Sequence, residues 1–95
     1  MYKIRLSKSS YFRQKPTTNG YFCGGWRYIA CGYKIPLTTD ICFQRPYIYK
    51  TKNGACHSAQ ALKTKLGSLW SVYVEEDDTE KVVFSLEGDK NDERL

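Results

Sequence analysis

Cysteine and histidine are the residues of this chain whose side chains could bind a metal or serve as nucleophile and base. The four cysteines are separated by seven, ten and thirteen residues and are Cys23, Cys31, Cys42 and Cys56. Only Cys56 has a histidine beside it, His57, and adjacent helical residues point about 100° apart. Zinc sites usually contain a pair of ligands about two to four residues apart, which this chain lacks. We therefore expect reduced thiols with no disulfide, no metal and no cofactor.

The acidic residues and glycines give little support to an enzymatic reaction. His57 is the only histidine, and Asp40 is the only acid before residue 75. The acidic run Glu75–Asp78 lacks the internal glycine of a calcium loop, and Gly24-Gly25 precedes a strand pattern rather than a phosphate-binding helix. We expect a protein that is not an enzyme. A small enzyme with a triad assembled from distant residues is the alternative.

Cationic and aromatic residues alternate in several short segments, such as Trp26–Tyr28 and Arg45–Lys52. Lysine and arginine neutralise phosphates, and rings provide platforms on which bases stack, so this combination is typical of nucleic-acid binding. The candidate residues for binding a partner or nucleic acid are Arg13, Lys15, Arg27, Tyr28, Lys34, Arg45, Tyr47, Tyr49, Lys50 and Lys52. In the alternative interpretation, the rings fill the core of a small sheet.

Charge is divided sharply along the chain. Residues 1–74 contain twelve Lys or Arg and one acid, a net charge of +11, whereas residues 75–95 contain nine acids and three cations, a net charge of −6. Cations without nearby acids must face solvent, the acidic C-terminal part or an anionic partner. Glu75 and Glu76 are candidates for an acidic contact with that partner. Alternatively, the acidic part neutralises the basic part within one molecule.

Two resemblances agree with a role in binding. The segment Tyr47–Lys52, followed by Ala55, Ala59 and Leu62, resembles the strand-to-helix passage of the arm-binding domains of tyrosine recombinases. This resemblance implies a basic three-stranded sheet, backed by one helix, that reads a DNA groove; the present chain adds a hairpin after the helix and ends in acidic residues. In length and style the chain is similar to the small anti-CRISPR inhibitors of phages and mobile elements, which implies a single domain that blocks a surface without catalysis.

The strands that must position these residues follow from the hydropathy pattern. Alternation of apolar and polar residues predicts strands at Tyr2–Lys8, Leu69–Val74 and Lys81–Leu86, the last two joined as a hairpin by an acidic link. Aromatic and β-branched residues predict a central strand at Trp26–Lys34 and a short strand at Pro46–Thr51.

Turn residues and helical spacing predict the remaining elements. Asn19-Gly20 predicts a turn between hairpin strands at Tyr11–Arg13 and Tyr21–Cys23, and the prolines of residues 35–46 predict a loop. One helix follows, with Asn53 as N-cap and Gly67 at its end; its apolar stripe is Ala55, Ala59, Leu62 and Leu66. The result is an α+β domain of residues 1–88, with a single antiparallel sheet of about four to five strands and one helix packed on one face. Residues 89–95 form a polar, frayed tail.

These features together predict a cytoplasmic protein, because Met1–Ser7 lacks the apolar run of an export signal and nothing in the chain suits a membrane. We expect a non-catalytic binding protein that blocks a nucleic-acid-handling complex, in the manner of an anti-defence, anti-CRISPR-like inhibitor. Its partner would be a host protein or ribonucleoprotein complex. The alternative is a free-standing module that binds DNA or RNA directly with the same basic, aromatic surface.

Overall fold

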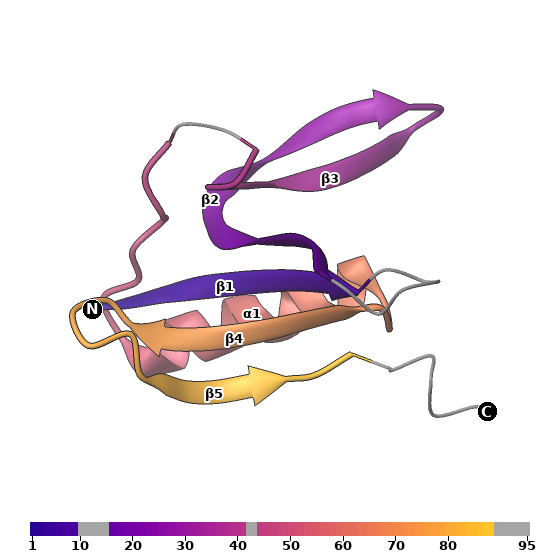
Figure 1. Ribbon diagram of the computed structural model, residues 1–95. Coiled ribbons are helices and arrows are strands. Elements are labelled where there is room, and N and C mark those ends of the chain that lie inside the picture. Colours follow the sequence, from indigo (N-terminus) through magenta and orange to yellow (C-terminus); the bar gives the residue numbers. More distant parts are fainter. Residues whose placement is uncertain (10–15, 42–43, 89–95) are drawn as a thin grey trace.

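The computed structural model describes residues 1–9, 16–41 and 44–88, and these residues form an α+β fold with one antiparallel sheet and one helix (Figure 1). The elements are β1 (Tyr2–Ser9), β2 (Pro16–Ala30), β3 (Tyr33–Thr38), α1 (Lys52–Leu66), β4 (Trp70–Glu76) and β5 (Val82–Leu86). The strand order across the five-stranded sheet is β3-β2-β1-β4-β5. The predicted fold class is therefore confirmed, as is the hairpin of β4 and β5.

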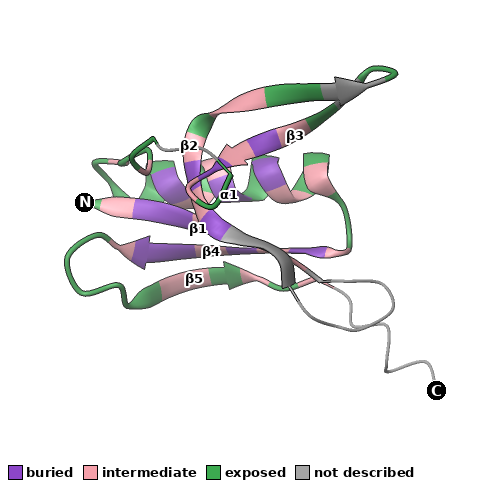
Figure 2. Cartoon of the chain, turned by 45° about the horizontal axis from the view of Figure 1, so that its top comes forward, coloured by how far each residue is buried: buried purple, intermediate pink, exposed green. Residues whose placement is uncertain are grey.

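The strand β1 lies in the middle of the sheet, and its alternating side chains contribute to both faces. Ile4 and Leu6 are fully buried on the face that α1 covers, as the alternation predicted. In register with Leu6 stand Gly20 of β2 and Val72 of β4. Buried residues are concentrated on β1, β4 and the inner side of α1, so the core lies between the helix and the middle of the sheet (Figure 2).

The helix α1 packs on β4, β1 and β5 through the predicted apolar stripe, of which Ala55, Ala59 and Leu62 are buried. Small residues let the helix approach the sheet closely, while the opposite side of the helix is exposed. No helix within the described residues is long and apolar enough to cross a membrane.

The ends of α1 are set by two local interactions. Thr51 has extended backbone angles, and its hydroxyl accepts a hydrogen bond from the amide of Gly54 at 3.1 Å. The N-cap is thus Thr51, and the prediction of Asn53 was wrong by two residues because the threonine hydroxyl satisfies the first turn earlier. Gly67, with φ +95°, ends the helix where the sequence predicted.

The strand β2 is long because it pairs with two different strands. Its first part pairs with β1 and its second part with β3, and the register shifts after Phe22, beside Gly24, whose φ is +94°. From Gly24 onward, β2 and β3 form a hairpin that projects from the rest of the sheet (Figure 1). We call residues 24–37 the outer hairpin. Its two-residue turn, Cys31-Gly32, has φ values of +50° and +82°, which is the pattern of a type I′ turn.

Two expectations for this region are wrong. Asn19-Gly20 is not a turn, because Gly20 lies within β2 at a crowded position where a Cβ would be 2.7 Å from Asp40 Oδ1. Here glycine serves close packing rather than a reversal of the chain. Trp26–Lys34 is not one central strand, because the turn at Cys31-Gly32 divides it into the two sides of the outer hairpin.

The predicted loop of residues 35–46 also differs, because its first part belongs to β3 and contains Pro36. The sheet order places β3 at an edge, where a proline is tolerated because its missing N–H breaks no interior ladder. The predicted turn-flanking strand Tyr11–Arg13 and the predicted tail 89–95 lie outside the described residues.

The segment Pro46–Thr51 is not the predicted strand. Tyr49 exchanges two backbone hydrogen bonds with Tyr2, of 2.8 and 2.7 Å, and the Tyr47 amide donates to the Phe22 carbonyl at 2.9 Å. The segment is therefore tied to two different strands at single points, which prevents a continuous ladder. The strand that the resemblance to recombinase arm-binding domains implies at Tyr47–Lys52 is therefore not formed.

We predict that Gly24→Ala destabilises the protein more than Gly32→Ala. Both residues have positive φ, which costs an L-residue about 1–2 kcal/mol. At Gly24 the new Cβ would also lie 2.7 Å from Tyr47 Cδ2, whereas at Gly32 no atom lies within 4 Å. Urea denaturation of the two variants measures the difference, and equal losses would show that the Tyr47 contact does not hold the bend.

Candidate nucleic-acid interface

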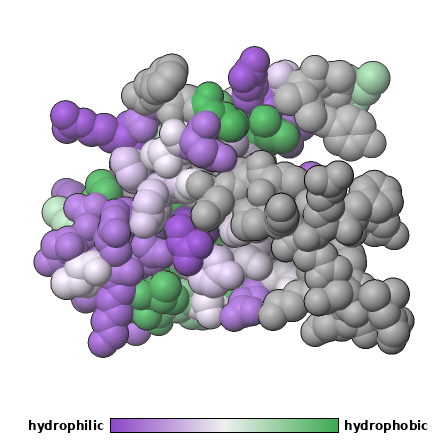
Figure 3. All heavy atoms as spheres, viewed as in Figure 1, coloured by the Kyte–Doolittle hydropathy of each residue, from purple (hydrophilic) through white to green (hydrophobic). Residues whose placement is uncertain are grey.

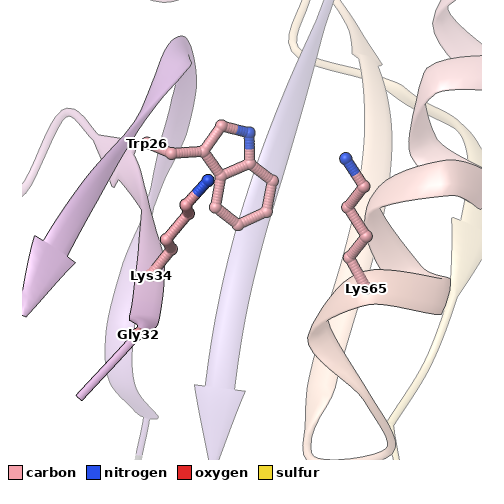
Figure 4. Close-up of a pocket in the computed structure, with 4 residues that line it drawn as sticks. All are labelled: Trp26, Gly32, Lys34 and Lys65. Atoms are coloured by element: carbon pink, nitrogen blue, oxygen red, sulfur yellow. The ribbon is translucent and has the colours of Figure 1, made fainter. Parts of the chain in front are cut away.

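The outer hairpin and α1 enclose a cleft of about 400 Å³, lined by Trp26, Gly32, Lys34 and Lys65 (Figure 4). Trp26 and Lys34 come from the hairpin, and Lys65 reaches toward them from the helix. A second hollow of about 180 Å³ shares Trp26 and Lys65 with the cleft. We call it the inner hollow; its other lining residues are Phe22, Tyr49, Ser58, Ala61 and Leu62.

The alternation of β2 explains why rings and cations meet at the cleft. Trp26 and Tyr28 lie two residues apart on the same side of the strand, and Tyr28 stands opposite Lys34 of β3. The Lys34 ammonium lies 5.1 Å from the centre of the Tyr28 ring, and the Lys65 ammonium lies 5.5 Å from the centre of the Trp26 ring. Both cations are thus held against aromatic faces without being neutralised.

Within the described residues, the ion-paired cations are separated from those at the cleft. Among the described residues, no carboxylate lies within ion-pair distance of Lys34 or Lys65; the ion pairs seen there involve Lys3 and Arg5. The acids Asp77 and Glu80 belong to the β4–β5 turn, which lies beside the N-terminus and away from the tip of the outer hairpin (Figure 1). Hydrophilic side chains cover this turn end of the molecule (Figure 3). The cleft therefore keeps a positive potential.

Of the predicted binding residues, Lys34 lines the cleft, and Tyr28, which is 68% exposed, lies beside Lys34 on the outer hairpin. Arg27 is exposed on the other side of the hairpin, because neighbouring strand residues point to opposite faces. Trp26, which could have been a core ring, is partly buried and packs edge-on against Phe22 with ring centres 6.2 Å apart. Trp26 therefore packs against the core and also lines the cleft.

The predicted residues of the 44–52 segment do not line the cleft. Arg45, Tyr47, Lys50 and Lys52 are exposed along this connection, while Tyr49 is half-buried and lines the inner hollow. Lys52 and Lys65 lie thirteen positions apart on α1, near its two ends. Arg13 and Lys15 lie outside the described residues.

Sequence reasoning missed Lys65, which completes the cleft. Ser58, Ala61 and Lys65 follow the three- and four-residue spacing of one helix side, next to the buried stripe. That spacing is visible in the sequence, but nothing in the sequence shows that a hairpin thirty residues earlier lies over this side of the helix.

Glu75, proposed as a contact for a partner, is instead buried on the sheet face opposite the helix, with 4% of its surface exposed. Arg5 Nε donates to its Oε2 at 2.6 Å, and the Tyr21 hydroxyl donates to its Oε1 at 2.7 Å. Both oxygens are therefore engaged within the molecule, because β4 places them beside cations of β1. Glu76 is partly buried, and its carboxylate accepts a hydrogen bond from the Thr79 hydroxyl at 2.8 Å within the turn.

Lys3 is buried on the same face of the sheet as Glu75. Its ammonium lies 2.8 Å from Glu80 Oε2 and 4.3 Å from the centre of the Tyr21 ring. Burial, followed by the hydrogen bond to Glu75, raises the pKa of the Tyr21 phenol well above its usual value. The hydrogen bond from Lys3 lowers the pKa of Glu80. For Lys3 and Arg5, the acidic part does neutralise the basic part within one molecule.

The described residues contain no group of three His, Cys, Asp or Glu side chains placed to hold a metal ion. His57 is exposed on the outer side of α1, and Cys56 beside it is half-buried. Comparisons with protein-family models, with curated proteins and with solved structures found no match. The cleft is therefore the structural feature that bears on function.

We predict that Arg5→Met lowers the free energy of unfolding by about 3 kcal/mol, because it leaves the Glu75 carboxylate buried without its cation. The double variant Arg5→Met/Glu75→Leu should recover most of this loss, since apolar side chains of similar volume can replace a buried pair. Chemical denaturation measures both. A double variant no more stable than Arg5→Met would contradict the pairing.

We predict that stability declines at both extremes of pH. The pKa of Tyr21 is raised in the folded state, so its contribution is present below the ordinary value of 10.0 and is lost as the pH rises past it. The pKa of Glu80 is lowered, so its contribution is lost as the pH falls below the ordinary value of 4.5. Urea midpoints across pH measure both, and Tyr21→Phe should reduce the alkaline decline while most of the acid decline, which the Lys3 contact causes, remains.

Proposed function

We propose that this chain is a non-catalytic, cytoplasmic binding protein that engages single-stranded nucleic acid through the cleft and the outer hairpin. The observation that supports this most is the cleft itself, which Trp26, Lys34 and Lys65 line, with the Tyr28 ring beside Lys34. Phosphates favour the cations, and unpaired bases favour the rings.

The exposure of the rings favours single strands over duplexes. Tyr28 is 68% exposed and Trp26 is partly exposed, so both offer ring faces to a ligand. A base within a duplex already stacks on its neighbours and cannot stack on these rings. Further exposed cations lie outside the cleft, with Arg27 on the opposite side of the hairpin and Lys50 and Lys52 near the N-terminal end of α1. The free thiols of Cys31 and Cys56 suit a reducing compartment.

We predict that Lys65→Glu weakens binding of a fluorescently labelled single-stranded oligonucleotide about tenfold, and that it reduces the dependence of affinity on salt. Lys81→Glu is the matched control, because Lys81 is also exposed, changes the net charge equally and lies beside the acidic turn. Fluorescence anisotropy at several salt concentrations measures both. Equal weakening by the two variants would mean that only net charge matters, and no binding by the unaltered protein would reject the proposal.

A second candidate function is the block of a nucleic-acid-handling protein complex, as expected of an anti-defence inhibitor. The observation that favours it is the acidic turn, where Asp77 and Asp78 are exposed at an end of the molecule separate from the cleft. Such carboxylates could occupy a cationic groove that normally receives nucleic acid.

Affinity capture from the host lysate, with and without nuclease, distinguishes the two functions. A protein complex that is retained after nuclease and weakened by Asp77→Asn/Asp78→Asn would favour the block. Retention that depends on intact nucleic acid and on Lys65 would favour direct binding.

A further inference from the structure

The cleft and the inner hollow differ in chemistry although they share Trp26 and Lys65. The cleft adds Lys34 and the exposed turn glycine Gly32, so it is cationic and opens to solvent. The inner hollow adds the rings of Phe22 and Tyr49 and the methyl group of Ala61, so it is mainly apolar. A ligand that fills both must carry an anionic group joined to a flat, mostly apolar group.

We infer that these two spaces form a binding site for one nucleotide, with its base in the inner hollow against Trp26 and its phosphate between Lys34 and Lys65. This inference rests on the proposed function and identifies a single nucleotide as the part of the nucleic acid that the site binds. A cleft of about 400 Å³ lies within the range of small-ligand pockets, roughly 300–1,000 Å³.

At the C-terminal end of α1, a second lysine offsets the negative end of the helix dipole, which favours an anion near Lys65. Helix C-termini carry partial negative charge, which would repel a phosphate. Lys63 of the last turn brings a positive charge to this end, where its ammonium donates to the carbonyl of the cap residue Gly67 at 3.0 Å and to that of Trp70 in β4 at 2.7 Å. Lys65, two residues later, lines the cleft. The two lysines of the last turn thus have separate roles.

The inner hollow provides polar groups for the edge of a base as well as a stacking surface. Ser58 and Tyr49, which both carry hydroxyl groups, line the hollow together. Their hydroxyl groups can donate to or accept from a base, whichever its edge requires. Trp26 is held in position by its edge-on contact with Phe22, so the indole does not need to be ordered when a ligand arrives.

The test uses adenosine 5′-monophosphate as the probe, with amide chemical shifts and tryptophan fluorescence as readouts. The chain has two tryptophans, and Trp70 is buried with 7% of its surface exposed, so quenching by a stacked base reports mainly on Trp26. We expect quenching together with shifts at Trp26, Lys34 and Lys65. Adenosine and inorganic phosphate, which each lack one half of the probe, should bind more weakly.

Ala61→Met should weaken binding of the mononucleotide by about tenfold, the effect of losing one stacked base, because the longer side chain fills the inner hollow. Ala61 is exposed on α1, so the change spares the core, and Gln60→Met is the matched control on the neighbouring, exposed position. Gln60→Met should leave the affinity within about twofold, since it adds the same side chain outside the hollow.

The outcomes separate this inference from the proposed function. If oligonucleotides bind but the mononucleotide shifts no residue of the cleft, or if Ala61→Met binds both as well as Gln60→Met does, the nucleotide site is wrong while nucleic-acid binding stands. If the mononucleotide binds in the cleft and oligonucleotides do not bind, the site is correct and the protein recognises free nucleotides instead. If neither binds, both proposals are rejected.

Discussion

The positive φ of Gly24 is the constraint on which the candidate site depends, because it lets β2 leave one sheet partner and join another. Before the bend, β2 pairs with β1; after it, the strand carries Trp26 to the cleft, beside Lys65 of α1. Tyr47 packs directly on this glycine, and its amide is bonded to Phe22 just before the bend. The connection to α1 therefore helps to hold the angle that opens the cleft.

The charge network on the other sheet face has a complementary role. Arg5 and Tyr21 donate hydrogen bonds to the two carboxylate oxygens of Glu75, and Lys3 forms an ion pair with Glu80. These contacts hold β1, β2 and the β4–β5 hairpin together. A buried pair of this kind adds little net stability over apolar packing but strongly penalises arrangements that separate its members. The network leaves Lys34 and Lys65 at the cleft without carboxylates among the described residues.

Aromatic residues connect the core to the proposed binding surface. The buried cluster consists largely of small and aliphatic side chains, and Trp26 and Tyr49 pack on its border rather than inside it. Rings at a border are held by the core on one side and remain accessible on the other. This position resolves the two interpretations of the aromatic residues, because Trp26 contributes to packing and to the cleft at once.

The sequence alone determined the elements whose pattern is local. The alternation of Ile4 and Leu6, the apolar stripe from Ala55 to Leu62 and the stop at Gly67 were all predicted, because each depends on neighbours within a few residues. Contacts between distant segments were decided only by the tertiary structure. The sequence predicts a turn at Gly20 and an exposed acid at Glu75, whereas the structure packs Asp40 against Gly20 and pairs Glu75 with Arg5. The role of Lys65 becomes apparent only because the structure places it beside Trp26 of the outer hairpin. Local propensity is a property of the chain, whereas burial and pairing depend on which distant residues fill the same space.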